Sequence, residues 1–248
     1  MRSSSVSLLV ALARRWSGAA LFVVLVVASP WLVFHNLGRN PRPWHDEGEA
    51  LSIPKTLVED GVYAVKGTDG YRTFGAVQSV GPTVTLPVAL AYRMLGVGLW
   101  QGRLVIAGFT LVTVWLFFAV GARMGTPGAA FTALALMLGS PAAGFLLNGR
   151  QVLGEVPALG VLLAAWLIWS GTIHSARWSP SVIAGLCLGA AIVSKSQYLP
   201  ISIGTCVLLA VLDHFYYRQR QIRALLVMSV SAVACFGVWQ LAQWWMFG

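Results

Sequence analysis

Polar and apolar positions follow one another along the chain in long blocks rather than in short periods. Seven apolar blocks can each cross or nearly cross a bilayer as a helix: they lie at about 18–37, 104–121, 128–147, 152–171, 181–194, 198–213 and 224–247. The segment 82–97 is short and contains Pro82, Pro87 and Arg93, so we interpret it as an interfacial or re-entrant helix. The pattern predicts an all-α polytopic membrane protein with about seven transmembrane helices.

Basic residues in the short loops indicate how these spans are oriented. With seven spans, the cytoplasmic loops carry Arg123, Arg177, Arg218, Arg220 and Arg223. If segment 82–97 also crossed the bilayer, all five would lie outside, against the usual cytoplasmic bias of Lys and Arg. We therefore expect a cytoplasmic N-terminus, a first outer loop at about 38–103, and Arg150 and Lys195 on that same outer side.

Composition narrows the class of protein further. Of the 248 residues, 57% are hydrophobic and only 10% charged, which excludes an ordinary soluble domain and predicts an integral protein of the plasma or inner membrane. The net charge of +9 is scattered between apolar spans, so we expect no nucleic-acid partner. The three cysteines have no zinc or disulfide spacing. We interpret residues 1–248 as a single transmembrane domain and, because they stop at the end of a span, as the N-terminal part of a longer protein.

Acidic residues concentrate in one polar window after the first span. Six of the eight Asp and Glu side chains fall there, beginning with Asp46, Glu47 and Glu49. Two interpretations are compatible. Asp46 and Glu49 have the spacing of a helix N-cap and its N3 partner, and a carboxylate fixed at a helix start beside a membrane is also suited to act as a general base.

The order of motifs in this chain resembles the GT-C glycosyltransferases, membrane enzymes that use lipid-phosphate sugars. Protein O-mannosyltransferases and aminoarabinose transferases are the most similar in pattern. The resemblance covers about 18–213. It rests on Trp44-His45-Asp46-Glu47, on 57–63, on the juxtamembrane segment 81–96, on Arg103-Leu104, on the acidic turn 150–157 and on the glycine-rich segment 185–195 that ends in Lys195.

This resemblance implies a function and a set of site residues. The first-loop acidic pair supplies the catalytic base, which falls here on Asp46 with Glu47 beside it. The basic groups for the lipid phosphate are Lys195 and, by side and position, Arg150, Arg72 and Arg93, with Glu155 in the acidic turn. The implied reaction moves a sugar, with inversion, from a polyprenyl- or dolichyl-phosphate donor to an extracytoplasmic acceptor that is a protein, lipid or glycan.

Simpler roles remain open for two of these residues. Lys195 could reach the interface from a helix end as a snorkelling side chain, and Arg150 could form a loop ion pair with Glu155. Two positions also depart from the family pattern. Glu155 is followed by Val156, where the family often has Asp followed directly by Pro, and Gly81 stands where aminoarabinose transferases carry a phosphate-contacting lysine. These departures argue against aminoarabinose transfer. They leave the broader class of lipid-phosphate-sugar transferases intact.

Other functions and a cofactor are also compatible with the sequence. We assign no cofactor and no metal ligands, although His45 beside Asp46 and Glu47 leaves a divalent cation possible. A transporter or flippase could line its path with Arg150, Glu155 and Lys195. A catalytically silent subunit with the same fold is the third alternative. The expected partners are a lipid-linked donor, the acceptor and membrane lipids.

Overall fold

The computed structural model describes residues 20, 23–72, 80–172, 178–212, 214–215 and 222–247, and this part of the chain is mostly helical. An N-terminal helix covers Val23–Phe34. The elements that follow it are α2 (His45–Asp60), β1 (Val65–Gly67), β2 (Gly70–Arg72), α3 (Pro82–Leu95), α4 (Leu99–Met124), α5 (Pro127–Gly139), the 3₁₀ turn η1 (Pro141–Ala143), α6 (Phe145–Asn148), α7 (Glu155–Thr172), α8 (Ser179–Ser194), α9 (Tyr198–Leu212) and α10 (Ile222–Phe247).

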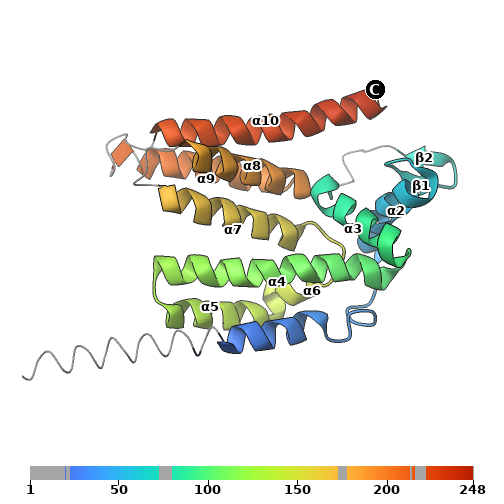
Figure 1. Ribbon diagram of the computed structural model, residues 1–248, viewed down its shortest axis with the longest axis horizontal. Helices are drawn as coiled ribbons and strands as arrows, with labels where there is room; N and C mark the ends of the chain where they lie inside the picture. The colour runs from blue at the N-terminus through green and yellow to red at the C-terminus, as the bar shows by residue number, and fades with distance from the viewer. Residues whose placement is uncertain are drawn as a thin grey trace, which may run out of the picture.

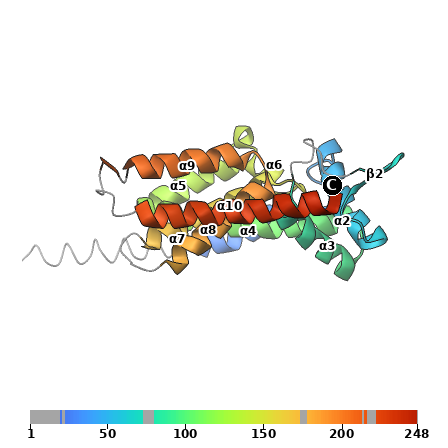
Figure 2. The same ribbon diagram turned by 90° about the horizontal axis from the view of Figure 1, so that it is seen from above.

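The long helices form a row in which α4 packs on α5 and α7, and α8 packs on α7 and α10 (Figure 1). The N-terminal helix lies along α4 and α5, because Leu25 shares an apolar cluster with Val114 and Leu134. Seen from above, α9 runs to one side of the row, in contact with α8 and α10 (Figure 2). The helices α2 and α3 and the β1–β2 hairpin gather at one end.

Each end of the bundle carries an arginine of α4, and the distance between the two arginines is about the thickness of a bilayer's hydrocarbon core. Arg103 and Arg123 stand twenty positions apart on α4, which corresponds to about 30 Å along a helix. Arg103 contacts the α2 end of the molecule, whereas Arg123 donates to the carbonyl of Ser170 near the end of α7, at 3.0 Å. The two arginines therefore lie at opposite ends of the bundle, and which end faces the cytoplasm stays a prediction.

By length and apolar composition, two helices among the described residues can cross a membrane, Leu99–Met124 and Ile222–Met246. Five other apolar helices are shorter than that criterion requires. The predicted block 128–147 is divided, because Ser140 ends α5 and its Oγ accepts a hydrogen bond from Ala143 N in η1 at 3.4 Å. The helical class is confirmed, and the count of seven spans stays a prediction.

Small residues allow the helices of the row to approach closely. Gly185 and Gly189 of α8 are four positions apart and face α10, where a Cβ atom at Gly185 would overlap the carbonyl oxygen of Met228. On α4, Thr110 Oγ1 donates to Gly149 O at 2.5 Å and Thr113 Oγ1 to Val156 O at 3.2 Å. Close contacts of this kind drive helix association where lipid removes the usual hydrophobic advantage.

A methyl group at Gly185 should therefore weaken the bundle. We expect Gly185→Ala to lower the free energy of unfolding by about 1–3 kcal/mol, because α10 must move away to relieve the overlap. The matched control is Gly204→Ala on α9, where an added Cβ meets no atom within 4 Å. Thermal unfolding of both variants in the same detergent measures the difference. Equal unfolding temperatures would contradict close α8–α10 packing.

Candidate active site at the α2 end

The two acidic residues of the first loop lie in the first turn of α2, where their side chains face different surroundings. Trp44 is the N-cap residue and makes no side-chain capping bond, so the predicted capping box with Asp46 as N-cap is wrong. Asp46 and Glu47 both lie in the first helical turn, but Asp46 is exposed and Glu47 is buried. Adjacent residues on a helix point about 100° apart, which explains how one carboxylate faces solvent while its neighbour faces the bundle.

Glu47 forms a buried ion pair with Arg103 of α4. Glu47 Oε1 accepts from Arg103 Nε at 2.7 Å and Oε2 from Nη2 at 2.6 Å, while both side chains are almost fully buried, at 1% and 0% exposed. This is the two-pronged geometry in which an arginine and a carboxylate interact most strongly. A buried charge without its partner is costly, so each side chain fixes the other.

Further bonds extend this ion pair to three segments of the chain. The remaining terminal nitrogen of Arg103, Nη1, donates to Leu37 O at 3.0 Å and to Pro41 O at 2.8 Å. Glu47 Oε1 also accepts from the backbone N–H of Val152 at 3.1 Å. The pair thus ties the end of the N-terminal helix, the start of α2 and the α6–α7 turn to α4, and it fixes the position from which Asp46 projects.

A second ion pair joins α7 to the end of α8. Lys195 Nζ lies 2.8 Å from Glu155 Oε1, and the Lys195 side chain is only 7% exposed. This contact contradicts two of the alternatives that the sequence left open, a snorkelling Lys195 and an Arg150–Glu155 ion pair. The second carboxylate oxygen of Glu155 is buried and has no hydrogen-bond partner among the described residues.

The start of α3 docks against this second ion pair. Val80 forms an antiparallel bridge with Lys195, and Gly81 N donates to Ser194 O at 3.2 Å. A Cβ atom at Gly81 would overlap the carbonyl oxygen of Val193. The position that carries lysine in aminoarabinose transferases therefore has no room for any side chain here, which gives the departure at Gly81 a steric reason.

Arg150 carries a positive charge that the described contacts leave uncompensated. One of its terminal nitrogens donates to the carbonyl of His35, and its Nε is buried without a partner in the described part of the chain. Burial first, and the nearby charge of Arg103 second, lower the pKa of the Arg150 guanidinium. An anion beside it would offset both effects by favouring the charged form, which makes Arg150 a candidate to receive a phosphate.

The two other predicted basic residues lie apart from this network. Arg72 ends β2 and pairs with exposed Asp69 at 3.3 Å, and Arg93 is exposed in the last turn of α3. Within the described residues, no hydrogen bond or ion pair links either of them to Glu47, Arg103 or Lys195. The structure thus brings Asp46, Glu47, Arg150, Glu155 and Lys195 to one end of the bundle and leaves Arg72 and Arg93 at its surface.

Arg103 is the residue that sequence reasoning missed, because we interpreted it only as the start of the second span. A signal was present. An arginine that opens an apolar span needs a partner, and Glu47 in the preceding polar window is a carboxylate of opposite charge.

A metal site has no support in the described part of the chain, which contains no group of three or more His, Cys, Asp and Glu side chains able to hold an ion. His45 instead lies 3.5 Å from Glu49 Oε1.

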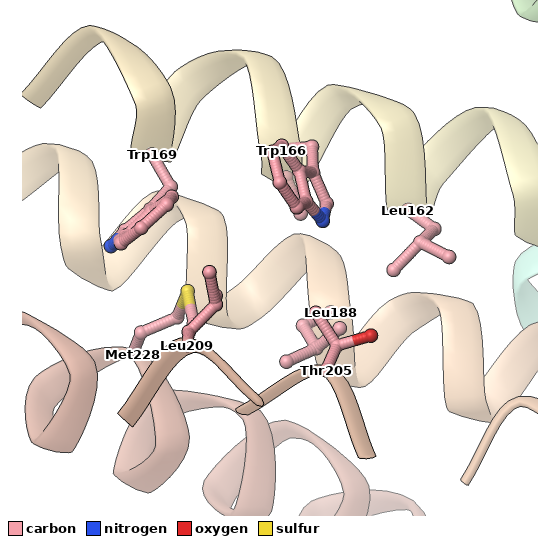
Figure 3. Close-up of a pocket in the computed structure, with 8 residues that line it drawn as sticks. Leu162, Trp166, Trp169, Leu188, Thr205, Leu209 and Met228 are labelled. Atoms are coloured by element: carbon pink, nitrogen blue, oxygen red, sulfur yellow. The ribbon is translucent and has the colours of Figure 1, made fainter. Parts of the chain in front are cut away.

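An apolar pocket between α7, α8, α9 and α10 is not part of this site. Trp166 and Trp169 line it from α7 with an edge-to-face contact, opposite Thr205, Leu209 and Met228 (Figure 3). Its volume is about 10 Å³, which suffices for one water molecule at most. No ionisable side chain lines it, so we assign it to packing.

Comparison with known proteins identifies the fold. No protein-family model matches the chain, and no curated protein matches it. Among solved structures, ArnT from Cupriavidus metallidurans bound to undecaprenyl phosphate superposes with a TM-score of 0.65 at 20% identity, over 90% of this chain. The apo form of that protein gives 0.69 at 17% identity, over 91%. The chain shares the fold of these ArnT structures.

That resemblance extends over a part of the larger protein only. The chain covers 41% and 43% of the two ArnT chains. At such low identity the similarity establishes the fold and leaves the reaction to be argued from the site.

Proposed function

We propose that the chain acts in a membrane glycosyltransferase that takes a sugar from a polyprenyl- or dolichyl-phosphate donor. The acceptor is a protein, lipid or glycan outside the cytoplasm. One observation carries the proposal: an exposed carboxylate, Asp46, is fixed by a buried ion pair at the same bundle end as the uncompensated charge of Arg150. The similarity of the fold to that of ArnT, whose structure was solved with bound undecaprenyl phosphate, supports the proposal.

Each group has a role in a single displacement. Asp46 takes the proton of the acceptor hydroxyl as its oxygen bonds to the anomeric carbon. The bond from that carbon to the phosphate oxygen breaks, and the lipid phosphate leaves with the electron pair. Arg150 stabilises the charge that develops on this phosphate. Attack from the face opposite the leaving group inverts the anomeric carbon.

Lys195 and Glu155 have a more limited part in this proposal. Their ion pair holds the start of α7 against the end of α8, beside the turn that carries Arg150. An ammonium group has three N–H donors, so Lys195 can keep Glu155 and still donate to a phosphate. Because Gly81 admits no lysine, we propose a donor other than the aminoarabinose lipid.

Arg150→Gln should weaken binding of the phosphate. With undecaprenyl phosphate as the probe, we expect the dissociation constant to rise about tenfold, the loss typical of one hydrogen bond to a charged group. The control is Arg123→Gln, at the end of the bundle far from Arg150. This variant should bind undecaprenyl phosphate as the wild type does. Native mass spectrometry of the detergent-solubilised chain measures all three proteins.

The same experiment separates the proposal from its alternatives. If the wild type fails to bind undecaprenyl phosphate, the lipid-phosphate function is wrong. If it binds but membranes containing it transfer no sugar from polyprenyl-phosphate hexoses or pentoses, the chain is a silent lipid-binding subunit. Transport of the labelled lipid across proteoliposomes without transfer would establish the flippase alternative instead.

A further inference from the structure

A groove of about 300 Å³ lies between the N-terminal helix and α5. Its walls are apolar: Leu25, Leu32 and Phe131 of the two helices and Leu146 of α6 are among the side chains that line it. Its length follows from the lining residues, which run from Val24 to Leu32 along one face of the helix. Eight residues correspond to about 12 Å. A volume of this size is at the lower limit of pockets that hold small ligands.

Small residues keep this groove open toward the surroundings of the bundle. Ala28, Ala135 and Gly139 line it and are exposed. A Cβ atom at Gly139 would meet no atom within 4 Å, so the space beside it is empty rather than tightly packed. Ser29 also lines the groove, is 2% exposed, and its hydroxyl has no hydrogen-bond partner among the described residues. An apolar groove with one hydroxyl unpartnered among the described residues is unlike the close packing of the rest of the row.

One end of the groove lies near the chain segments that carry and contact Arg150, the proposed phosphate site. Leu32 lies about one helical turn before His35, whose carbonyl accepts from Arg150. On the other wall, Leu146 precedes Gly149 and Arg150 in the α6–α7 turn. A molecule with its phosphate on Arg150 could therefore continue into the groove without crossing the bundle.

We propose that this groove binds the phosphate-proximal isoprene units of the lipid-linked donor. The inference rests on the proposed function, because it takes the anchored phosphate from that site. Three features support a polyprenyl chain as the occupant: the apolar walls, the small side chains of Ala28, Ala135 and Gly139, and the few residues that separate Leu32 and Leu146 from His35 and Arg150.

Filling the groove should reduce the affinity for the lipid. We expect Gly139→Leu to raise the dissociation constant for undecaprenyl phosphate about three- to tenfold. The loss of affinity is modest because the polyprenyl tail is surrounded by apolar groups in the bilayer as well as in the groove. The groove therefore adds only closer packing. The matched control is Gly204→Leu on α9, where an added side chain also meets open space. Native mass spectrometry compares both variants with the wild type.

A second measurement does not depend on the stability of any variant. The wild-type chain is irradiated with an undecaprenyl phosphate analogue that carries a photoreactive group on its first isoprene units, and the labelled peptides are identified. Labelling within Val23–Phe34 and Pro127–Gly139 is the expected result. Labelling confined to other helices would overturn the inference.

The outcomes distinguish the groove from the proposed function. If the wild type does not bind undecaprenyl phosphate at all, the function fails and this inference fails with it. If the wild type binds and Gly139→Leu binds equally well, the groove inference alone is wrong. A copurified phospholipid that Gly139→Leu displaces, with unchanged affinity for undecaprenyl phosphate, would show that the groove holds a bilayer acyl chain instead.

Discussion

Asp46→Asn should lower the rate of sugar transfer by about 10²- to 10⁴-fold, the usual contribution of a general base. The amide has the shape of the carboxylate but cannot take the proton of the acceptor hydroxyl. The bundle should remain folded, because Asp46 is exposed and Glu47 keeps its contacts with Arg103. The loss of a first-turn carboxylate costs α2 only about 0.3–1 kcal/mol.

The comparison variant is Asp69→Asn in the β1–β2 hairpin. It removes a charge from the same acidic window, where Asp69 pairs with exposed Arg72, and it should leave the rate within about twofold because the pair is surface-exposed. Rates and undecaprenyl phosphate affinities are measured in parallel. A loss of rate in Asp46→Asn without a loss of affinity assigns Asp46 to the chemical step. Equal rates in both variants would exclude Asp46 as the base.

The helical framework was predictable from the sequence because lipid-facing helices leave long runs of apolar residues. The break inside 128–147 was also visible, in the Ser140-Pro141 pair that ends α5 and begins η1. We missed it because a run of apolar residues looks the same whether it is one helix or two short ones. Helix lengths are therefore less predictable than helix identity.

The site was predictable in its residues but not in its pairings. The acidic window pointed to Asp46 and Glu47 together, since a linear pattern does not show which of two adjacent carboxylates faces the bundle. Glu155 could have paired with Arg150, five positions earlier in the chain, as one alternative that the sequence left open. In the structure it contacts Lys195, which is distant in sequence and adjacent in space. Such contacts depend on helix packing, which composition and spacing do not specify.

Glu47→Ala should lower the free energy of unfolding by about 3–5 kcal/mol, because Arg103 would remain buried with its charge uncompensated. Arg103 is 0% exposed, so water cannot replace the carboxylate without opening the bundle. The matched control is Glu59→Ala in the same helix. Glu59 forms only an exposed pair with Lys55 at 4.0 Å, and its loss should cost at most about 0.5 kcal/mol. Chemical denaturation in detergent measures both variants.

A partial rescue would show that the charge, and not only the shape, is responsible. In Glu47→Met with Arg103→Met, no buried charge remains, so stability should exceed that of Glu47→Ala. It should stay below the wild type, because Leu37 O and Pro41 O lose their donor. Transfer should remain impaired in the double variant, since the start of α2 is no longer fixed beside Asp46. If Glu47→Ala and Glu59→Ala were equally stable, the Glu47–Arg103 pair would not be what holds the site together.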